Sequence, residues 1–177
     1  MNNRIPVENW CRTVAVVVSM TIFAGVADGQ QGDRISKAQV QAVLDSIDKA
    51  CLNKDAAAVI ANYASNAVIT ATVVQNGQTY TNRQNREDYR RALENSLKNA
   101  ADYSLRHRDV AIQIAPDGQT AQCSFTLIER WRGDIGKMEE GDTKESLGLV
   151  RVDDKLLIAR DHSDVTVVTQ TGNSINK

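Results

Sequence analysis

The stretch YSLRHRDVAIQIAPDGQTAQCSFTLIERWR, from Tyr103 to Arg132, decides the fold. Apolar and polar residues alternate along much of each half, which is typical of strands with one buried face. Between the halves, Pro116, Asp117 and Gly118 form a favoured turn sequence. The stretch therefore predicts two long antiparallel strands. The other segments are expected to pair with, or pack on, the antiparallel sheet that these strands begin.

Two further strands are predicted after this pair. A polar loop, 133–142, leads into the strand TKESLGLVRV at 143–152. The turn Asp153-Asp154-Lys155 then begins the last strand, which runs to Val168. The polar residues 169–177 are expected to be a disordered tail.

Three amphipathic helices and a hairpin precede the long strands. The helices are expected at residues 35–51, 54–64 and 85–102, and the hairpin at 66–81. Ser36 and Gln39 form a capping-box pair at the first helix, and Asp55 caps the second. Asn76-Gly77 is the dipeptide that best fits a two-residue hairpin turn.

Helices grouped before strands predict an α+β domain over residues 34–168, with about three helices packed against one face of an antiparallel sheet. If the sheet is strongly curved and the helices lie on its concave side, a space remains between the two layers. Such a space is a natural ligand pocket.

The N-terminus has the pattern of a secretory signal peptide, which we assign to residues 1–27. Arg4 and Arg12 accompany the apolar run TVAVVVSMTIFAGVA. This run of roughly fifteen residues is shorter than the ~20 residues of a membrane span, although an uncleaved anchor is the alternative. We expect cleavage near Ala27 or just after Gly29, which would leave a periplasmic protein without a membrane span.

Composition excludes some partners. The net charge of −1 changes only to about −2 when the signal segment is removed, which argues against nucleic-acid binding. Cys51 and Cys123 remain, and they are either a disulfide or two buried thiols. The histidines and cysteines have no zinc-site spacing, and the sequence lacks a phosphate loop and a nucleotide fingerprint. We therefore expect neither a metal nor a cofactor.

The chain resembles the nuclear-transport-factor-2-like superfamily, in its bacterial SnoaL-like branch, from Ile35 to Val168. Four segments carry the resemblance: NKDAAAVIANYASNAVIT at the second helix, NREDYRRAL at the third, PDGQTAQCSF at the strand turn and VDDKLLIARDHSD at the closing strand. The resemblance implies a cone-shaped curved sheet with helices on its concave face.

The sequence also departs from the family pattern. Leu156 stands where the closing strand usually has Trp, and Asn66 stands where many members carry Asp. No Tyr/Asp pair falls at the spacing of the ketosteroid isomerase members. Since the superfamily includes enzymes, binding proteins and assembly subunits, the resemblance does not choose a function.

Regular alternation along the last strand would place Leu156, Ile158, Arg160 and His162 on one face. Because Leu156 and Ile158 are apolar, we expect this face to be the inner one. His162 would then be either a general base or a residue at the pocket rim whose ring hydrogen-bonds to a neighbour. The rim interpretation is preferred, because no second group stands at catalytic spacing.

Alternation along the strand at 119–132 puts Phe125, Leu127, Glu129 and Trp131 on one face, towards the pocket. Glu129 would be a desolvated acid or base, or else an edge carboxylate paired with an arginine. The expected ligand-binding residues are Tyr63, Tyr80, Phe125, Leu127, Trp131, Ile158 and Arg160.

The strand from Tyr103 carries an irregular pattern. Leu105 and His107 share one face, whereas Ile112 and Ile114 share the other with Val110, which indicates a β-bulge or a strand apolar on both faces. His107 faces away from its two arginine neighbours. An anionic ligand could be held by Arg83, Arg86, Arg90, Arg106 and Arg108, but a solvated face balanced by acids is the preferred interpretation.

Three functions remain open at this stage. The first is an exported binding or accessory domain with a mostly apolar pocket for a small apolar or amphipathic ligand. The second is a cofactor-free lyase or isomerase that uses His162 or Glu129 as its base, with Tyr80 or Arg160 steadying an oxyanion. The third is a protein-interaction module that forms a homodimer through the outer face of the sheet.

Overall fold

The computed structural model describes residues 34–75, 78–132 and 138–168, and the predictions for the signal segment 1–27 and the tail 169–177 lie outside them. The elements follow the predicted order: α1 (Lys37–Leu52), α2 (Ala56–Ile60), β1 (Tyr63–Gln75), β2 (Gln78–Gln84), α3 (Arg86–Asn99), β3 (Ala101–Ile114), β4 (Thr120–Arg132), β5 (Met138–Val152) and β6 (Lys155–Val168). No helix in this described part is both long and apolar enough to cross a membrane.

The six strands form one curved sheet in the order β2-β1-β6-β5-β4-β3. Four neighbouring pairs are antiparallel, as predicted, and β1 pairs with β6 in parallel. The parallel pair arises because the β3–β6 meander begins at the far edge of the sheet and ends beside β1. The predicted α+β class with a curved sheet is therefore confirmed, in a mixed rather than purely antiparallel form.

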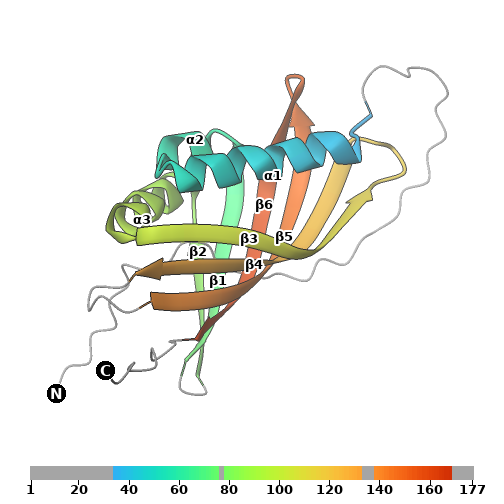
Figure 1. Ribbon diagram of the computed structural model, residues 1–177. Coiled ribbons are helices and arrows are strands. Elements are labelled where there is room, and N and C mark those ends of the chain that lie inside the picture. The colour runs from blue at the N-terminus through green and yellow to red at the C-terminus, as the bar shows by residue number, and fades with distance from the viewer. Residues whose placement is uncertain (1–33, 76–77, 133–137, 169–177) are drawn as a thin grey trace, which may run out of the picture.

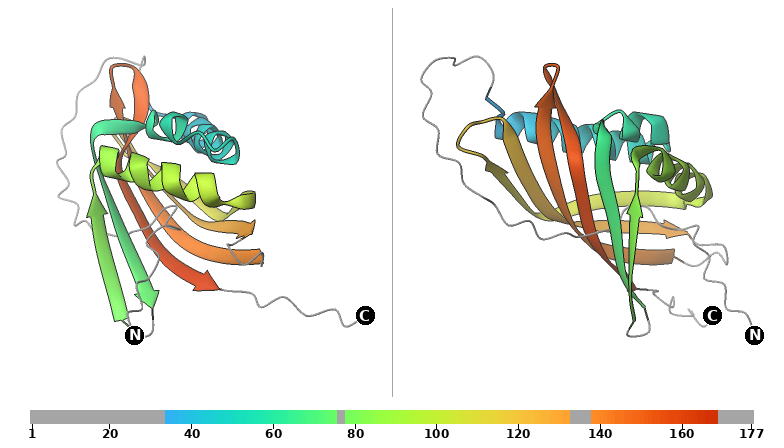
Figure 2. Two further views of the ribbon diagram at one scale, coloured as in Figure 1. Left: turned by 90° about the vertical axis from the view of Figure 1, so that its left-hand side faces the viewer. Right: turned by 180° about the vertical axis from the view of Figure 1, so that it is seen from behind.

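All three helices lie on one side of the sheet, which is its concave side (Figures 1 and 2). α1 packs on α2, β3 and β6, whereas α3 packs on α2, β1 and β2. α1 begins as predicted: the Ser36 side chain accepts a hydrogen bond from the Gln39 amide, and the Gln39 side chain accepts one from the Ser36 amide. Backbone N–H groups at the start of α1 are thus hydrogen-bonded by side chains of the same segment, and no other helix or strand is needed to cap the helix.

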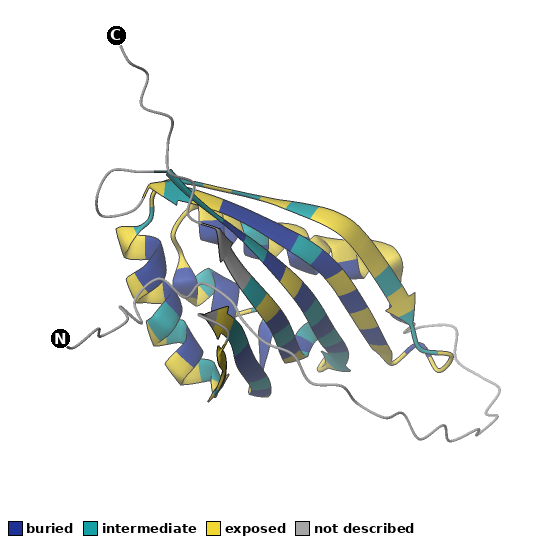
Figure 3. Cartoon of the chain, turned by 90° about the horizontal axis from the view of Figure 1, so that it is seen from below, coloured by how far each residue is buried: buried dark blue, intermediate teal, exposed yellow. Residues whose placement is uncertain are grey.

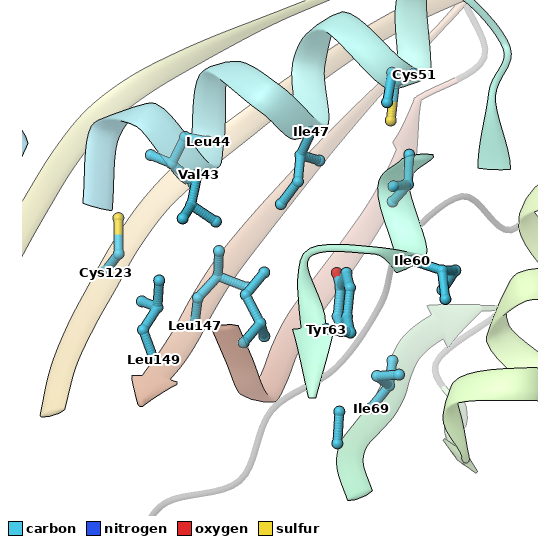
Figure 4. Close-up of a cluster of buried hydrophobic side chains, with 14 of the residues drawn as sticks. Val43, Leu44, Ile47, Cys51, Ile60, Tyr63, Ile69, Cys123, Leu147 and Leu149 are labelled. Carbon is cyan, nitrogen blue, oxygen red and sulfur yellow. The ribbon is translucent and has the colours of Figure 1, made fainter. Parts of the chain in front are cut away.

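The core lies between α1 and the concave face of the sheet (Figure 4). Val43, Leu44 and Ile47 of α1 point towards Leu147 and Leu149 of β5, and all of these residues are buried. Cys51 and Cys123 are both buried and unbonded to each other, at opposite ends of this cluster. The open question about these cysteines is therefore resolved in favour of two packed thiols.

β4 and β5 show regular alternation along much of their length, which Figure 3 displays as bands of buried and exposed residues. Cys123, Phe125, Leu127 and Glu129 are all buried on the concave face, as predicted. β5 begins at Met138, earlier than the predicted residue 143, because its polar first residues pair with the end of β4. The ion pair between Arg130 and Glu140, at 3.1 Å, forms across this added ladder.

β6 breaks the alternation that the sequence predicts. Ile158 pairs with Leu149 and Arg160 pairs with Gly148, so Ala159 is an extra residue in the ladder. This β-bulge turns all later side chains of β6 to the opposite face. The predicted common face of Ile158, Arg160 and His162 is therefore wrong: Ile158 faces the core, whereas the other two lie on the convex face.

Of the two alternatives for the strand from Tyr103, the structure shows the β-bulge. The register with β4 shifts between Arg108 and Ala111, and Asp109 has a positive φ of 58°. Because of this shift, Leu105 and His107 share the concave face with Ile112, and Arg106 and Arg108 remain exposed on the convex face. The concave face of the strand is thus mainly apolar, and it also carries His107.

The second helix is shorter than predicted and ends at Ile60 rather than at 64. The side-chain amide of Asn62 donates to the Ala58 carbonyl at 2.9 Å, and the Asn62 carbonyl accepts from the Ile158 amide at 2.8 Å. These bonds turn the chain into β1, so Tyr63 belongs to the sheet and not to the helix.

Candidate functional site

Three acidic side chains are buried on the concave face, one from each of three neighbouring strands. Glu129 of β4 is 5% exposed, and Glu145 of β5 and Asp161 of β6 are each 3% exposed. In register, Asp161 lies beside Leu147, and Glu145 lies between Phe125 and Ser163. The concave face is therefore apolar near α1 and carries polar groups further along the strands.

Asp161 is held by a tyrosine of β1. The Tyr63 hydroxyl donates to the Asp161 carboxyl at 2.5 Å, and both residues are buried. The Tyr63 ring meets the Tyr89 ring of α3 edge to face, with centroids 5.5 Å apart. Since Tyr63 neighbours Ile158 across the ladder, the bulge at Ala159 is what brings Asp161 to its face of the sheet.

Glu129 is held by a tyrosine of β3, in a similar arrangement. The Tyr103 hydroxyl hydrogen-bonds to the Glu129 carboxyl across the β3–β4 pair. Tyr103 is only partly buried, so this second pair lies nearer to solvent than the first. The Glu129 side chain is buried and contacts a tyrosine, so it does not lie at an exposed edge.

A histidine on the same face contacts an acid of α1. His107 Nε2 of β3 lies 3.3 Å from Asp48 Oδ1, and the two side chains are 10% and 24% exposed. The imidazole also rests on the Phe125 ring, with centroids 4.4 Å apart. Both atoms of this contact are buried, and they lie within ion-pair distance without meeting hydrogen-bond geometry.

The histidine and the Tyr103–Glu129 pair are neighbours on the sheet. His107 is opposite Leu127, and Leu105 is opposite Glu129, so His107 and Glu129 stand on one diagonal of the antiparallel pair. Side chains on such a diagonal are close enough for long groups to interact. The concave face thus brings a His–Asp pair and a Tyr–Glu pair to one region of two adjacent strands.

Two further groups lie close to the centre of this face. Ser163 is fully buried, and its Oγ has no hydrogen-bond partner among the described residues. Burial raises the pKa of the Cys123 thiol to about 11, and the Glu145 carboxylate adds to the rise. Cys123 is therefore an apolar packing group at neutral pH and not a nucleophile.

The predicted ligand-binding residues separate into distinct places. Phe125, Leu127 and Ile158 lie buried on the concave face, and Tyr63 is buried beside them. Trp131 follows Glu129 on the same face towards the end of β4, where its ring contacts Gly141. Tyr80 lies on the edge strand β2, exposed, and donates to the Gln78 side chain.

His162 and Arg160 lie on the opposite face from this cluster. His162 is paired with Ser146 and Thr70 in the sheet, and its Nε2 is 3.9 Å from Asp164. Partial burial lowers the pKa of His162, while the Asp164 carboxylate opposes this shift. The side chain lies on the opposite face from Glu129, so these two predicted catalytic residues do not share a site.

The arginines do not converge on an anion site. Arg90 forms ion pairs with Glu87 and Glu94 on the exposed side of α3, and Arg86 donates to the Ile60 carbonyl. Arg108 pairs with Asp109 at 3.2 Å. The solvated, charge-balanced interpretation of this group fits these contacts.

Sequence reasoning missed several of the polar residues on the concave face, namely Asp48, Tyr103, Glu145, Asp161 and Ser163. Because Glu145 alternates in step with Leu147 and Leu149, the sequence could have predicted that it faces the core. Asp161 and Ser163 were hidden by the bulge, and no local signal pairs α1 with β3. Within the described ranges, no three His, Cys, Asp or Glu side chains are grouped so that they could hold a metal ion.

Comparison with known proteins found no matching family model and no matching curated protein. Solved structures do match. The hexachlorocyclohexane dehydrochlorinase LinA-type3 from Novosphingobium barchaimii superposes with a TM-score of 0.62 at 10% identity, covering 80% of this chain and 94% of that one. The chain has the nuclear-transport-factor-2-like fold.

Other proteins of this fold have different roles. A proposed dehydratase of the NTF2-like family from Streptomyces avermitilis matches with a TM-score of 0.55 at 13% identity, covering 73% of this chain and 95% of that one. A proposed calcium/calmodulin dependent protein kinase II association domain from Xanthomonas campestris matches with a TM-score of 0.57 at 16% identity, covering 78% and 98%. At such identities the likeness shows the fold alone.

Replacing Tyr63 by Phe is expected to lower the free energy of unfolding by about 1–3 kcal/mol, because a buried carboxyl loses a donor. Tyr80→Phe is the matched control: the hydroxyl it removes is exposed, and the change should stay within about 0.5 kcal/mol. Urea denaturation of both variants measures the difference. Equal effects of the two substitutions would show that the Tyr63–Asp161 bond does not stabilise the fold.

Proposed function

We propose that this protein binds a small organic molecule on the concave face and catalyses a cofactor-free proton transfer, as a lyase or isomerase. The observation that carries the proposal is the contact between His107 and Asp48 beside the Tyr103–Glu129 pair. These four side chains come from α1, β3 and β4, and together they offer a base, a group that orients it and a proton donor.

His107 would be the base. A small rotation of the imidazole would let its Nε2–H donate to the Asp48 carboxylate, which would leave the lone pair on Nδ1. An imidazole lone pair can accept a proton from carbon next to a carbonyl or next to a carbon that bears a leaving group. Asp48 is then a positioning residue, since it would act only through His107.

The Tyr103–Glu129 pair would complete the reaction. In an elimination, the electrons of the broken C–H bond form the new C=C bond, and the leaving group departs with its own electron pair. A hydroxyl or carboxyl group can give that leaving group a proton, or can hydrogen-bond to an enolate oxygen in an isomerisation. Phe125 and Leu127 would supply the apolar wall that contacts the ligand body.

The comparisons support this class of reaction only through the fold. Three of the matching structures are named for eliminations, a dehydrochlorinase and two proposed dehydratases. The fold can therefore accommodate such chemistry, and in this chain the argument for it comes from the placement of its own side chains.

A non-catalytic binding or accessory domain is the second candidate. The buried apolar residues of the concave face favour it, since they would suit an apolar or amphipathic ligand. In this case the His107–Asp48 contact would serve to attach α1 to β3. The two candidates differ in one respect that can be measured. Only the first predicts turnover of a substrate, and that turnover requires the His107 imidazole.

Turnover can be tested with a panel of small β-hydroxy ketones and polychlorinated cyclohexanes, including hexachlorocyclohexane. Enone absorbance and chloride release are the readouts. His107→Ala is expected to reduce the rate on any accepted substrate by roughly 10²–10⁴-fold, which is the usual contribution of a general base. Asp48→Asn should lower kcat and alter the pH profile of the reaction.

His162→Ala is the matched control, because it removes the other described histidine from the convex face and should leave the rate within about twofold. Native mass spectrometry of the purified protein decides the second candidate. A retained small molecule that is never turned over, or turnover unaffected by His107→Ala, would contradict the catalytic proposal.

We also propose that the chain is exported to the periplasm after cleavage near Ala27, and that it forms a homodimer through the convex face of the sheet. The signal pattern at the N-terminus supports the first proposal. N-terminal sequencing of protein from the producing cells should begin near Asp28, and sedimentation should give twice the mature mass. An intact Met1 or a strict monomer would contradict the respective proposal.

A further inference from the structure

The convex face carries a hollow of about 500 Å³ that is separate from the concave site. It lies at the end of the sheet where β3 turns into β4, and residues of β3, β4, β5 and β6 line it. None of the residues proposed to act in catalysis contributes to its lining. Its volume falls in the range of small-molecule pockets.

One cross-strand row forms the base of the hollow. Gln113 pairs with Gln122, Gln122 with Gly148, and Gly148 with Arg160, so four neighbouring strands contribute in register. Gly148 has no side chain, and this leaves a gap in the row between Gln122 and Arg160. The Arg160 stem lies over the gap, because its Cβ is 3.4 Å from where a Cβ on Gly148 would stand.

The β6 bulge creates this arrangement. Without Ala159 as an extra residue, Arg160 would follow Ile158 onto the concave face. With it, Arg160 joins the convex row, and Ala159 itself lines the hollow. A bulge that redirects a side chain beside a cavity is a recurrent device at binding sites.

The lining determines the chemistry of the ligand. Arg160 is the one charged residue among the lining residues, and its guanidinium has no ion pair or hydrogen bond with any described residue. Gln113 and Gln122 add amide donors, and Pro116 and Val150 add apolar surface. The single positive charge of a guanidinium balances the charge of a monoanion, and a guanidinium binds a carboxylate through bidentate hydrogen bonds.

We propose that this hollow is a binding site for a small monocarboxylic acid, with the carboxylate on Arg160 and the apolar body against Pro116 and Val150. The side-chain amide of Gln122 donates to the same carboxylate across the gap at Gly148. Binding there is independent of the chemistry at His107.

Amide NMR titration of the full chain with benzoate tests the site, with benzamide as the uncharged probe of the same shape. Benzoate should shift the Gln122, Gly148 and Arg160 amides in a saturable way in the millimolar range, and benzamide should not. Arg160→Gln is expected to weaken binding by at least roughly tenfold. Gly148→Ala adds a methyl group to the base of the hollow, at ordinary contact distance from Arg160, and should also weaken binding.

Arg106→Gln is the matched control, since Arg106 is exposed on the same convex face outside the hollow. It should leave the affinity unchanged, as should His107→Ala, which separates this site from the proposed function. The proposal is overturned if benzoate gives no saturable shift, if benzamide binds equally well, or if Arg106→Gln weakens binding as much as Arg160→Gln.

Discussion

One extra residue in β6 determines the chemistry of both faces of the sheet. Ala159 has no partner of its own in the β5 ladder, so each side chain after it is on the face opposite to the one that regular alternation gives. Asp161 and Ser163 are thereby buried under the helices, and Arg160 and His162 are directed to the convex face. A regular strand would have buried a guanidinium and an imidazole instead, at a high desolvation cost.

The polar groups of the concave face are poorly explained by stability alone. Apolar residues of similar volume usually stabilise a core as well as buried acids do, and often better. Yet three acids occupy this face, and two of them accept hydrogen bonds from tyrosine hydroxyls. Hydrogen bonds of this kind fix the position of a carboxyl group, and a fixed position is what acid–base chemistry requires.

Much of the fold could be predicted because its signals are local. The capping residues of α1, the turn at Gly118 and the alternation in β4 each depend on a few neighbouring residues. The structure shows all three as predicted. The bulge in β3 was one of two alternatives that the sequence left open, because Leu105 and Ile112 cannot share a face without it. In β6 no such conflict was visible: Leu156, Ile158 and Arg160 give an acceptable pattern without a bulge.

The candidate site was less accessible to sequence reasoning, because its contacts join distant segments. Asp48 reaches His107 only after α1 has crossed the sheet to β3, and α2, β1, β2 and α3 separate the two residues in the chain. Glu129 was found because alternation in β4 is regular. Its neighbour His107 was correctly turned away from its adjacent arginines, but nothing local connects it to an acid on a helix.

The reversal of faces in β6 can be measured directly by nuclear Overhauser contacts of the Ala71 methyl group. Ala71 is buried on the concave face of β1 and pairs with Ser163. The bulged strand predicts contacts from this methyl group to the Ser163 β protons. Contacts to the ring protons of His162 instead would show a regular strand, and the assignment of side chains to both faces would be wrong.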